Sequence, residues 1–171
     1  VLPGVRVRVT AVGADSLQAS QEAAPVVAST AKIRLVLVPL STDDGVAQVP
    51  DLEAIRAALL RVYPYAAENI SISTRAALSV SGSSTADNWW TPALDVLERK
   101  RVLEDSGAYY YGLVPKMSAA RVAGLAYVNR RTGNFDFTSA IGVDASFVNI
   151  AAVDPFGNRW PAWLTTLVHE L

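Results

Sequence analysis

The strongest constraint on the fold is an apolar run near the N-terminal end of the chain. Residues 33–40, IRLVLVPL, are apolar at every position except Arg34. A strand that faces water on one side alternates apolar with polar residues, whereas a strand covered on both faces is nearly all apolar. We therefore expect this segment to lie inside a parallel sheet.

The segments that follow alternate between helix and strand patterns. Pro50-Asp51 opens a predicted helix with one apolar side, and Pro64 ends it. Residues 69–80 return as a strand, and a strand–helix–strand order implies parallel pairing through a right-handed crossover. Another helix is predicted from Thr91-Pro92 to about Glu104. Further strands are predicted at residues 108–114, 124–129, 138–143 and 147–152.

The predicted fold class is α/β, with a twisted, mostly parallel sheet of about five strands and packed helices. Val5, Val7 and Val9 alternate with polar residues and indicate a short strand that has no obvious partner. We interpret residues 1–31 as the tail of an upstream β module plus a linker, and residues 32–171 as a separate, incomplete domain. The first four residues show neither an initiating Met nor a signal-peptide pattern, so we expect the chain to begin inside a longer protein.

Composition excludes several classes of partner and site. The 171 residues carry 15 basic and 16 acidic side chains without a basic stripe, which argues against a nucleic-acid partner. No apolar run reaches the roughly 18 residues of a membrane span. The chain has no Cys and one His, so disulfides and Cys-ligated zinc are excluded.

The one histidine lies in a predicted amphipathic helix at the end of the sequence, residues 163–171, WLTTLVHEL. Leu164, Leu167, Val168 and Leu171 follow the i, i+3, i+4, i+7 spacing of a buried stripe. His169-Glu170-Leu171 matches the first three positions of H-E-x-x-H, in which two histidines bind zinc and the glutamate polarises the metal-bound water. A catalytic zinc needs about three protein ligands, so most of such a site would lie outside this sequence.

Several segments together resemble the N-terminal half of a metzincin zinc protease catalytic domain of the secreted bacterial type. The resemblance rests on IRLVLVPL, AYYYGLV, VAGLAYV and SAIGVD, followed by the helix TTLVHEL. The sequence stops within the family motif H-E-x-x-H-x-x-G-x-x-H, so the second and third histidines and the glycine are absent. The Met-turn is absent as well, because Met117 precedes the helix.

The resemblance implies a role for each matching residue. His169 would be the first ligand of a zinc ion (Zn²⁺), and Glu170 would be the general base of a zinc-dependent endopeptidase. Gly124, Leu125, Ala126 and Tyr127 would belong to an antiparallel edge strand that binds an extended peptide or protein substrate. The fragment alone is expected to be inactive and to need the C-terminal remainder of the domain as its partner. A secreted or cell-surface location is expected.

Two alternatives remain open from the residues. The helix could belong to another H-E-x-x-H clan of zinc hydrolases, in which a distant glutamate is the third ligand. Alternatively, the chain could be a non-catalytic binding or adhesion module in which the HEL sequence is coincidental.

Overall fold

The computed structural model describes residues 7–12, 18–23, 32–63, 65–105, 107–127, 138–147, 152–153 and 159–171. The chain divides by its internal contacts into two compact units, Val1–Ala31 and Lys32–Leu171.

The first unit contains a β-hairpin. Strand β1 (Val7–Val12) pairs antiparallel with β2 (Gln18–Ala23), in a register that sets Arg8 opposite Glu22. These two side chains form an ion pair of 2.9 Å. The strand predicted from the alternating valines therefore has a partner, contrary to expectation. Strand β2, QASQEA, was not predicted because it lacks the branched and aromatic residues typical of strands.

The second unit is built on a sheet with β3 (Ile33–Thr42) at its centre. β5 (Ile70–Thr74) and β7 (Tyr109–Val114) pair with β3 in parallel, and β9 (Ser139–Val143) continues in parallel from β7. β8 (Gly124–Ala126) pairs antiparallel with β9 and ends the strand order. The two-residue strands β4 (Gly45–Val46) and β6 (Leu78–Ser79) also pair with β3, antiparallel and parallel respectively.

The predicted α/β class is confirmed, and the sheet is mixed. Within the described residues it has seven strands where about five were expected, and β4 and β8 run antiparallel to their neighbours. Both very short strands, β4 and β6, pair near the C-terminal end of β3. Two-residue pairings of this kind leave no periodic pattern in a sequence, which explains the undercount.

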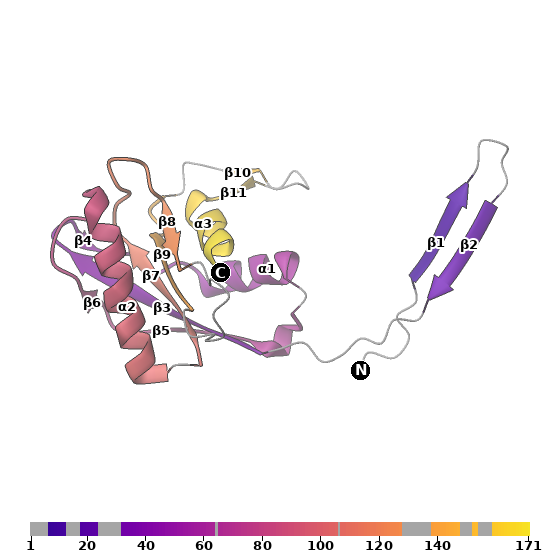
Figure 1. The fold of residues 1–171 in the computed structure, drawn as a ribbon, viewed down its shortest axis with the longest axis horizontal. Coiled ribbons are helices and arrows are strands. Elements are labelled where there is room, and N and C mark those ends of the chain that lie inside the picture. The colour runs from indigo at the N-terminus through magenta and orange to yellow at the C-terminus, as the bar shows by residue number, and fades with distance from the viewer. Residues whose placement is uncertain are drawn as a thin grey trace. The chain divides into compact units, whose positions relative to one another are not determined.

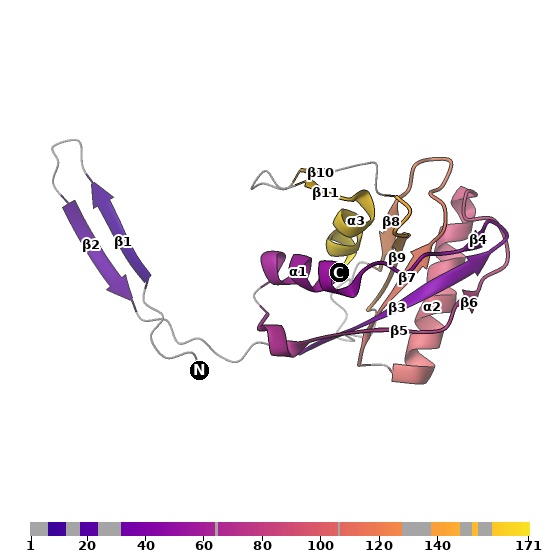
Figure 2. The same cartoon turned by 180° about the vertical axis from the view of Figure 1, so that it is seen from behind.

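Three helices cover the sheet. α2 (Trp90–Asp105) lies on one face, and α1 (Leu52–Val62) and α3 (Ala162–Glu170) lie on the other (Figures 1 and 2). Short 3-10 helices, η1 (Ala67–Asn69) and η2 (Asp87–Trp89), precede β5 and α2. The strands β10 (Ala152–Val153) and β11 (Arg159–Trp160) pair antiparallel just before α3.

The helix boundaries follow local capping. Asp51 caps α1 as predicted, because its Oδ1 accepts a hydrogen bond of 3.0 Å from the Glu53 backbone N–H. α2 begins at Trp90 rather than at the predicted Thr91-Pro92 cap, because η2 leads directly into it. Of the strands predicted at 124–129 and 147–152, residues 128–129 and 148–151 lie outside the described residues.

A buried polar network joins α2 to the sheet. Both carboxylate oxygens of Glu98 accept hydrogen bonds from the Arg101 guanidinium, at 2.6 and 2.8 Å. The Ser139 hydroxyl of β9 donates a third hydrogen bond, of 2.7 Å, to Glu98 Oε2. Only 1% of the Arg101 side chain is exposed, so this charge is removed from water and depends on the Glu98 carboxylate.

Candidate functional site

Helix α3 packs as its sequence spacing predicts. Pro161 occupies the N-cap position, and Thr165 Oγ1 donates a hydrogen bond of 3.3 Å back to the Pro161 carbonyl. Three of the four side chains of the predicted apolar stripe are buried, Leu171 is half-buried, and the opposite side of the helix is more accessible. The buried residues are Trp163, Leu164, Leu167 and Val168. This packing fixes the rotation of the helix and thereby the direction in which His169 projects.

His169 and Glu170 line one pocket together with the edge strand. The pocket encloses about 330 Å³, and Gly124 of β8 forms part of its wall. His169 is exposed, whereas Glu170 is partly buried. The other lining residues are Ala123, Thr165 and Thr166. The structure therefore brings the predicted metal ligand and the predicted base next to the predicted substrate strand.

Strand β8 lies at the edge of the sheet and leaves one side unpaired. Its residues pair with β9 in the register Gly124↔Gly142 to Ala126↔Ala140, and none of the described strands pairs with its other side. Leu125 and Tyr127 alternate to the face opposite Gly124. There the Tyr127 hydroxyl donates a hydrogen bond to Asp95 Oδ1 of α2. The Tyr127 side chain is therefore held on α2. A peptide on this edge would contact the backbone of Tyr127.

Gly124 and Gly142 allow α3 to lie close to the sheet. A Cβ at Gly124 would lie 2.5 Å from Thr166 Cγ2 and 2.8 Å from Glu170 Oε1. A Cβ at Gly142, directly opposite, would overlap the Tyr111 hydroxyl and lie 3.0 Å from Thr166 Cγ2. Because both positions lack a Cβ, the Glu170 carboxylate can reach across to β8.

Burial is the main cause of the pKa shifts of Glu170 and of Tyr111. It raises the pKa of the Glu170 carboxyl above its usual value, and the nearby His169 partly opposes this shift. The Tyr111 hydroxyl is fully buried, and its pKa is raised by burial and secondarily by the charge of Glu170. Within the described residues this hydroxyl has no hydrogen-bond partner. Burial of the Tyr111 hydroxyl and partial burial of Glu170 make this region weakly solvating for a negative charge.

The C-cap tyrosine of α1 contacts the last turn of α3. The Tyr63 hydroxyl donates a hydrogen bond of 2.9 Å to the Val168 carbonyl, which immediately precedes His169. The last carbonyls of a helix have no partner within the helix, and side-chain donors satisfy them. Tyr63 therefore holds α3 at the position from which His169 and Glu170 project.

We expect Tyr63→Phe to destabilise the second unit by about 1 kcal/mol, the typical net contribution of one hydrogen bond. The ring remains and only the donor is lost, so packing should be preserved. Urea denaturation followed by far-UV circular dichroism measures the change. Tyr65→Phe is the matched control, since Tyr65 packs against Tyr63 with ring centroids 5.9 Å apart. Equal stability of Tyr63→Phe and the unsubstituted protein would show that the hydrogen bond does not hold α3.

The described residues do not make up a zinc site by themselves. His169 is the one histidine of the chain, and no group of three or more potential His, Cys, Asp or Glu ligands gathers anywhere in the described ranges. His169 can supply one imidazole, and a catalytic zinc requires about two further protein ligands. For the described part of the chain, the predicted zinc site is therefore incomplete.

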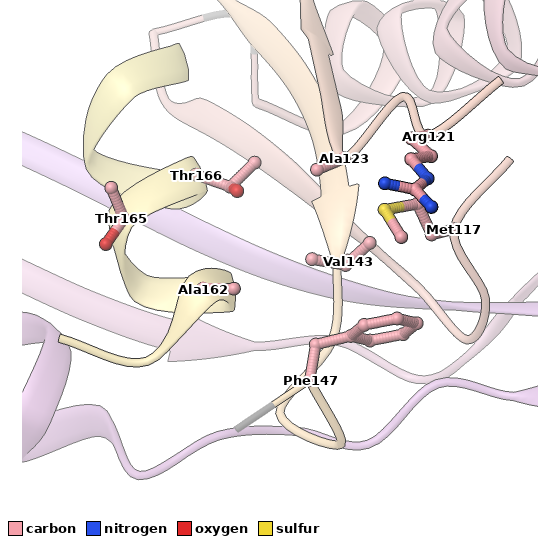
Figure 3. Close-up of a pocket in the computed structure, with 8 residues that line it drawn as sticks. All are labelled: Met117, Arg121, Ala123, Val143, Phe147, Ala162, Thr165 and Thr166. Carbon is pink, nitrogen blue, oxygen red and sulfur yellow. The ribbon is translucent and has the colours of Figure 1, made fainter. Parts of the chain in front are cut away.

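A second, larger pocket adjoins the first and was not anticipated from the sequence. It encloses about 620 Å³ and shares Ala123, Thr165 and Thr166 with the His169 pocket. Figure 3 shows Arg121 and Met117 on the side of this pocket that faces away from α3. The remaining lining residues are Val143, Phe147 and Ala162. Its walls come from α3, the end of β9 and neighbouring loops, and the spacing within any one of these segments does not reveal the pocket.

Comparisons with known proteins define no family for the chain. No family model matches the sequence, and no curated protein matches it. Among solved structures, the chain is similar to metalloproteinase-II from Bacteroides fragilis, with 16% sequence identity and a TM-score of 0.40. The match covers 70% of this chain and 39% of that one, so this chain corresponds to well under half of the metalloproteinase. No helix in the described ranges is long and apolar enough to cross a membrane.

Proposed function

We propose that residues 32–171 form part of a secreted zinc-dependent endopeptidase, in which His169 is one zinc ligand and Glu170 the general base. The observation that carries this proposal is the pocket that His169 and Glu170 line together with Gly124 of the edge strand. A ligand, a base and a free strand edge are the parts that peptide hydrolysis requires in one place. The remaining zinc ligands belong to residues outside the described structure.

The environment of Glu170 suits proton transfer. Burial raises the pKa of its carboxyl, which brings the group closer to the pH at which it must accept a proton. In the proposed reaction Glu170 takes a proton from the attacking water and later gives it to the leaving amine.

The free edge of β8 suits an extended peptide. A peptide that adds to an unpaired edge gains backbone hydrogen bonds without depending on particular side chains. Gly124 lies where β8 approaches Glu170 most closely, so a peptide on this edge passes near the carboxylate. We propose that Gly124, Leu125, Ala126 and Tyr127 contribute backbone groups to this binding, with the Tyr127 side chain fixed on α2.

Chelation tests the proposal on the full-length protein that contains this chain. We expect a strong chelator to abolish hydrolysis of an unstructured protein substrate and added Zn²⁺ to restore it, because the metal is an essential part of the proposed site. Product peptides are identified by mass spectrometry, and bound zinc is quantified before and after chelation. Hydrolysis that survives removal of all bound metal would contradict a zinc-dependent reaction.

A non-catalytic peptide-binding module is the second candidate. It is favoured by the incomplete ligand set of the described residues together with the unpaired edge of β8. This candidate predicts binding of an extended peptide that is unaffected by the chelator and is not followed by cleavage. Fluorescence anisotropy of a labelled peptide, combined with mass spectrometry of the same sample, separates the two functions.

A further inference from the structure

The larger pocket has an apolar wall and one cationic side chain. Met117, Val143 and Phe147 provide apolar surface, and Arg121 provides a guanidinium (Figure 3). A pocket of about 620 Å³ is large enough for an amino-acid side chain together with part of its backbone. Its lining therefore fits a group that is apolar along its length and negatively charged at its end.

The loop that carries Arg121 is held in place from several sides. The Arg121 backbone N–H donates a hydrogen bond of 2.9 Å to the Ser118 carbonyl, and the buried Ser118 hydroxyl accepts one of 2.9 Å from Val122 N–H. The loop is also tied to the segment before α2. There Ala120 N–H donates a 3.0 Å bond to Asp87 Oδ1. Arg121 is consequently presented by a fixed loop.

Arg121 itself adopts a backbone conformation that a non-glycine residue seldom takes. Its φ is +64°, in the left-handed region, where the Cβ atom is crowded. Such conformations cost about 1 kcal/mol or more and persist where the surroundings enforce them. The hydrogen bonds around Ser118 supply that enforcement, and the result is a positioned arginine beside a pocket.

The charge of Arg121 is uncompensated within the described chain. No described carboxylate forms an ion pair with Arg121. The Lys116 ammonium, in contrast, does have a partner, because its Nζ lies 3.6 Å from Asp44 Oδ1. Arg121 is also exposed, so a ligand can reach its guanidinium. The planar guanidinium fork binds a carboxylate through two parallel hydrogen bonds, which gives it geometric selectivity for that group.

We propose that this pocket binds a carboxylate-bearing residue of the peptide substrate, with its methylene groups on Met117, Val143 and Phe147 and its carboxylate on Arg121. The inference rests on the proposed endopeptidase function, since it names the substrate class of that site. The pocket shares Ala123, Thr165 and Thr166 with the His169–Glu170 pocket, so the bound residue lies close to the bond that is cleaved. The carboxylate can belong to an internal acidic side chain or to the C-terminus of the peptide.

The test compares three peptides on the full-length protein by their kcat/KM values. One has an internal Glu and an amidated end, the second has Gln there with an amidated end, and the third has Gln and a free carboxyl end. We expect a carboxylate to raise kcat/KM about twofold to fivefold over the amidated Gln peptide, as one solvent-exposed charge pair allows. Preference for the first peptide identifies the side chain as the source of the carboxylate, and preference for the third identifies the chain end.

Three variants assign the preference to Arg121. Arg121→Gln should abolish it, and Arg121→Glu should reverse it in favour of a peptide with Lys at the same position. Both variants keep the same backbone crowding at φ +64°, so neither should change stability through strain. Arg61→Gln is the matched control, because Arg61 is an exposed arginine at the end of α1 and lines neither pocket. Its peptide preference should equal that of the unsubstituted protein.

Failure of the inference differs from failure of the proposed function. Cleavage of all three peptides at equal kcat/KM would overturn the inference and leave the endopeptidase function standing. Absence of cleavage would overturn the function, and the pocket is then tested by equilibrium binding of the same labelled peptides. In that assay, tighter binding of a carboxylate peptide that is lost in Arg121→Gln supports the pocket, and equal binding of all three overturns it.

Discussion

Replacing Glu170 with glutamine lowers kcat for peptide hydrolysis by about 10²- to 10⁴-fold, the usual contribution of a general base. Glutamine has nearly the same size, so the contacts between Glu170 and β8 at Gly124 are retained. The amide cannot accept the proton of the attacking water, and it has no proton to return to the leaving amine. Initial rates on the full-length protein, measured from saturating to limiting peptide, separate kcat from KM.

The expected pattern is a loss in kcat with KM changed little, because the peptide binds along β8 and not to the carboxylate. Glu68→Gln is the matched control, since Glu68 is an exposed glutamate on η1 and lies outside both pockets. Bound zinc and the melting temperature should match the unsubstituted protein in both variants. A Glu170→Gln variant that keeps kcat within about threefold would show that another group is the base.

The sheet could be predicted where the sequence carries a long periodic signal. The apolar residues of β3 indicated a doubly covered strand, and four of its first eight positions are 2% exposed or less, namely Leu35, Leu37, Val38 and Leu40. The helix α1 could be bounded by its capping residue, Asp51. In contrast, β2 is polar and β4 and β6 have two residues each, so they arise from pairing with a neighbour and not from local preference.

The candidate site likewise has features that could be predicted from the sequence and features that could not. The spacing within α3 showed that His169 lies opposite the buried stripe, because a helix of fixed pitch determines its own faces. The approach of Gly124 to Glu170 could not be derived by spacing, since it joins residues 46 positions apart through the sheet. The antiparallel edge position of β8 was expected from the family resemblance alone. The Arg121 pocket assembles from α3, the end of β9 and neighbouring loops, and no local pattern marks it.

The burial of two charged residues of α2 could not be predicted from the sequence. Its stretch LERKRVLED looks like a solvated surface, yet Glu98 and Arg101 are buried against β9. Spacing of three residues places both on one side of the helix, but it does not reveal that this side faces the sheet. The partner that explains the burial lies on another element, because the Ser139 hydroxyl of β9 donates a hydrogen bond to Glu98. The burial of this pair is therefore a tertiary property.

Glu98→Ala is consequently expected to destabilise the second unit by about 3–5 kcal/mol, the cost of leaving one member of a buried ion pair without its partner. The substitution removes the two Glu98 oxygens that accept hydrogen bonds from the Arg101 guanidinium, one of which also accepts from the Ser139 hydroxyl. Urea denaturation followed by tryptophan fluorescence reports the loss, since Trp90 of the same helix is buried.

The double variant Glu98→Leu with Arg101→Met separates charge from packing. Apolar residues of similar volume leave no buried charge without a partner, so most of the stability should return. Because Ser139 keeps an unsatisfied hydroxyl in that variant, recovery should fall short by about 1 kcal/mol unless Ser139→Ala is added. A single Glu98→Ala variant that loses less than about 1 kcal/mol would show that water reaches Arg101 in solution, and that α2 is held to the sheet by its apolar contacts alone.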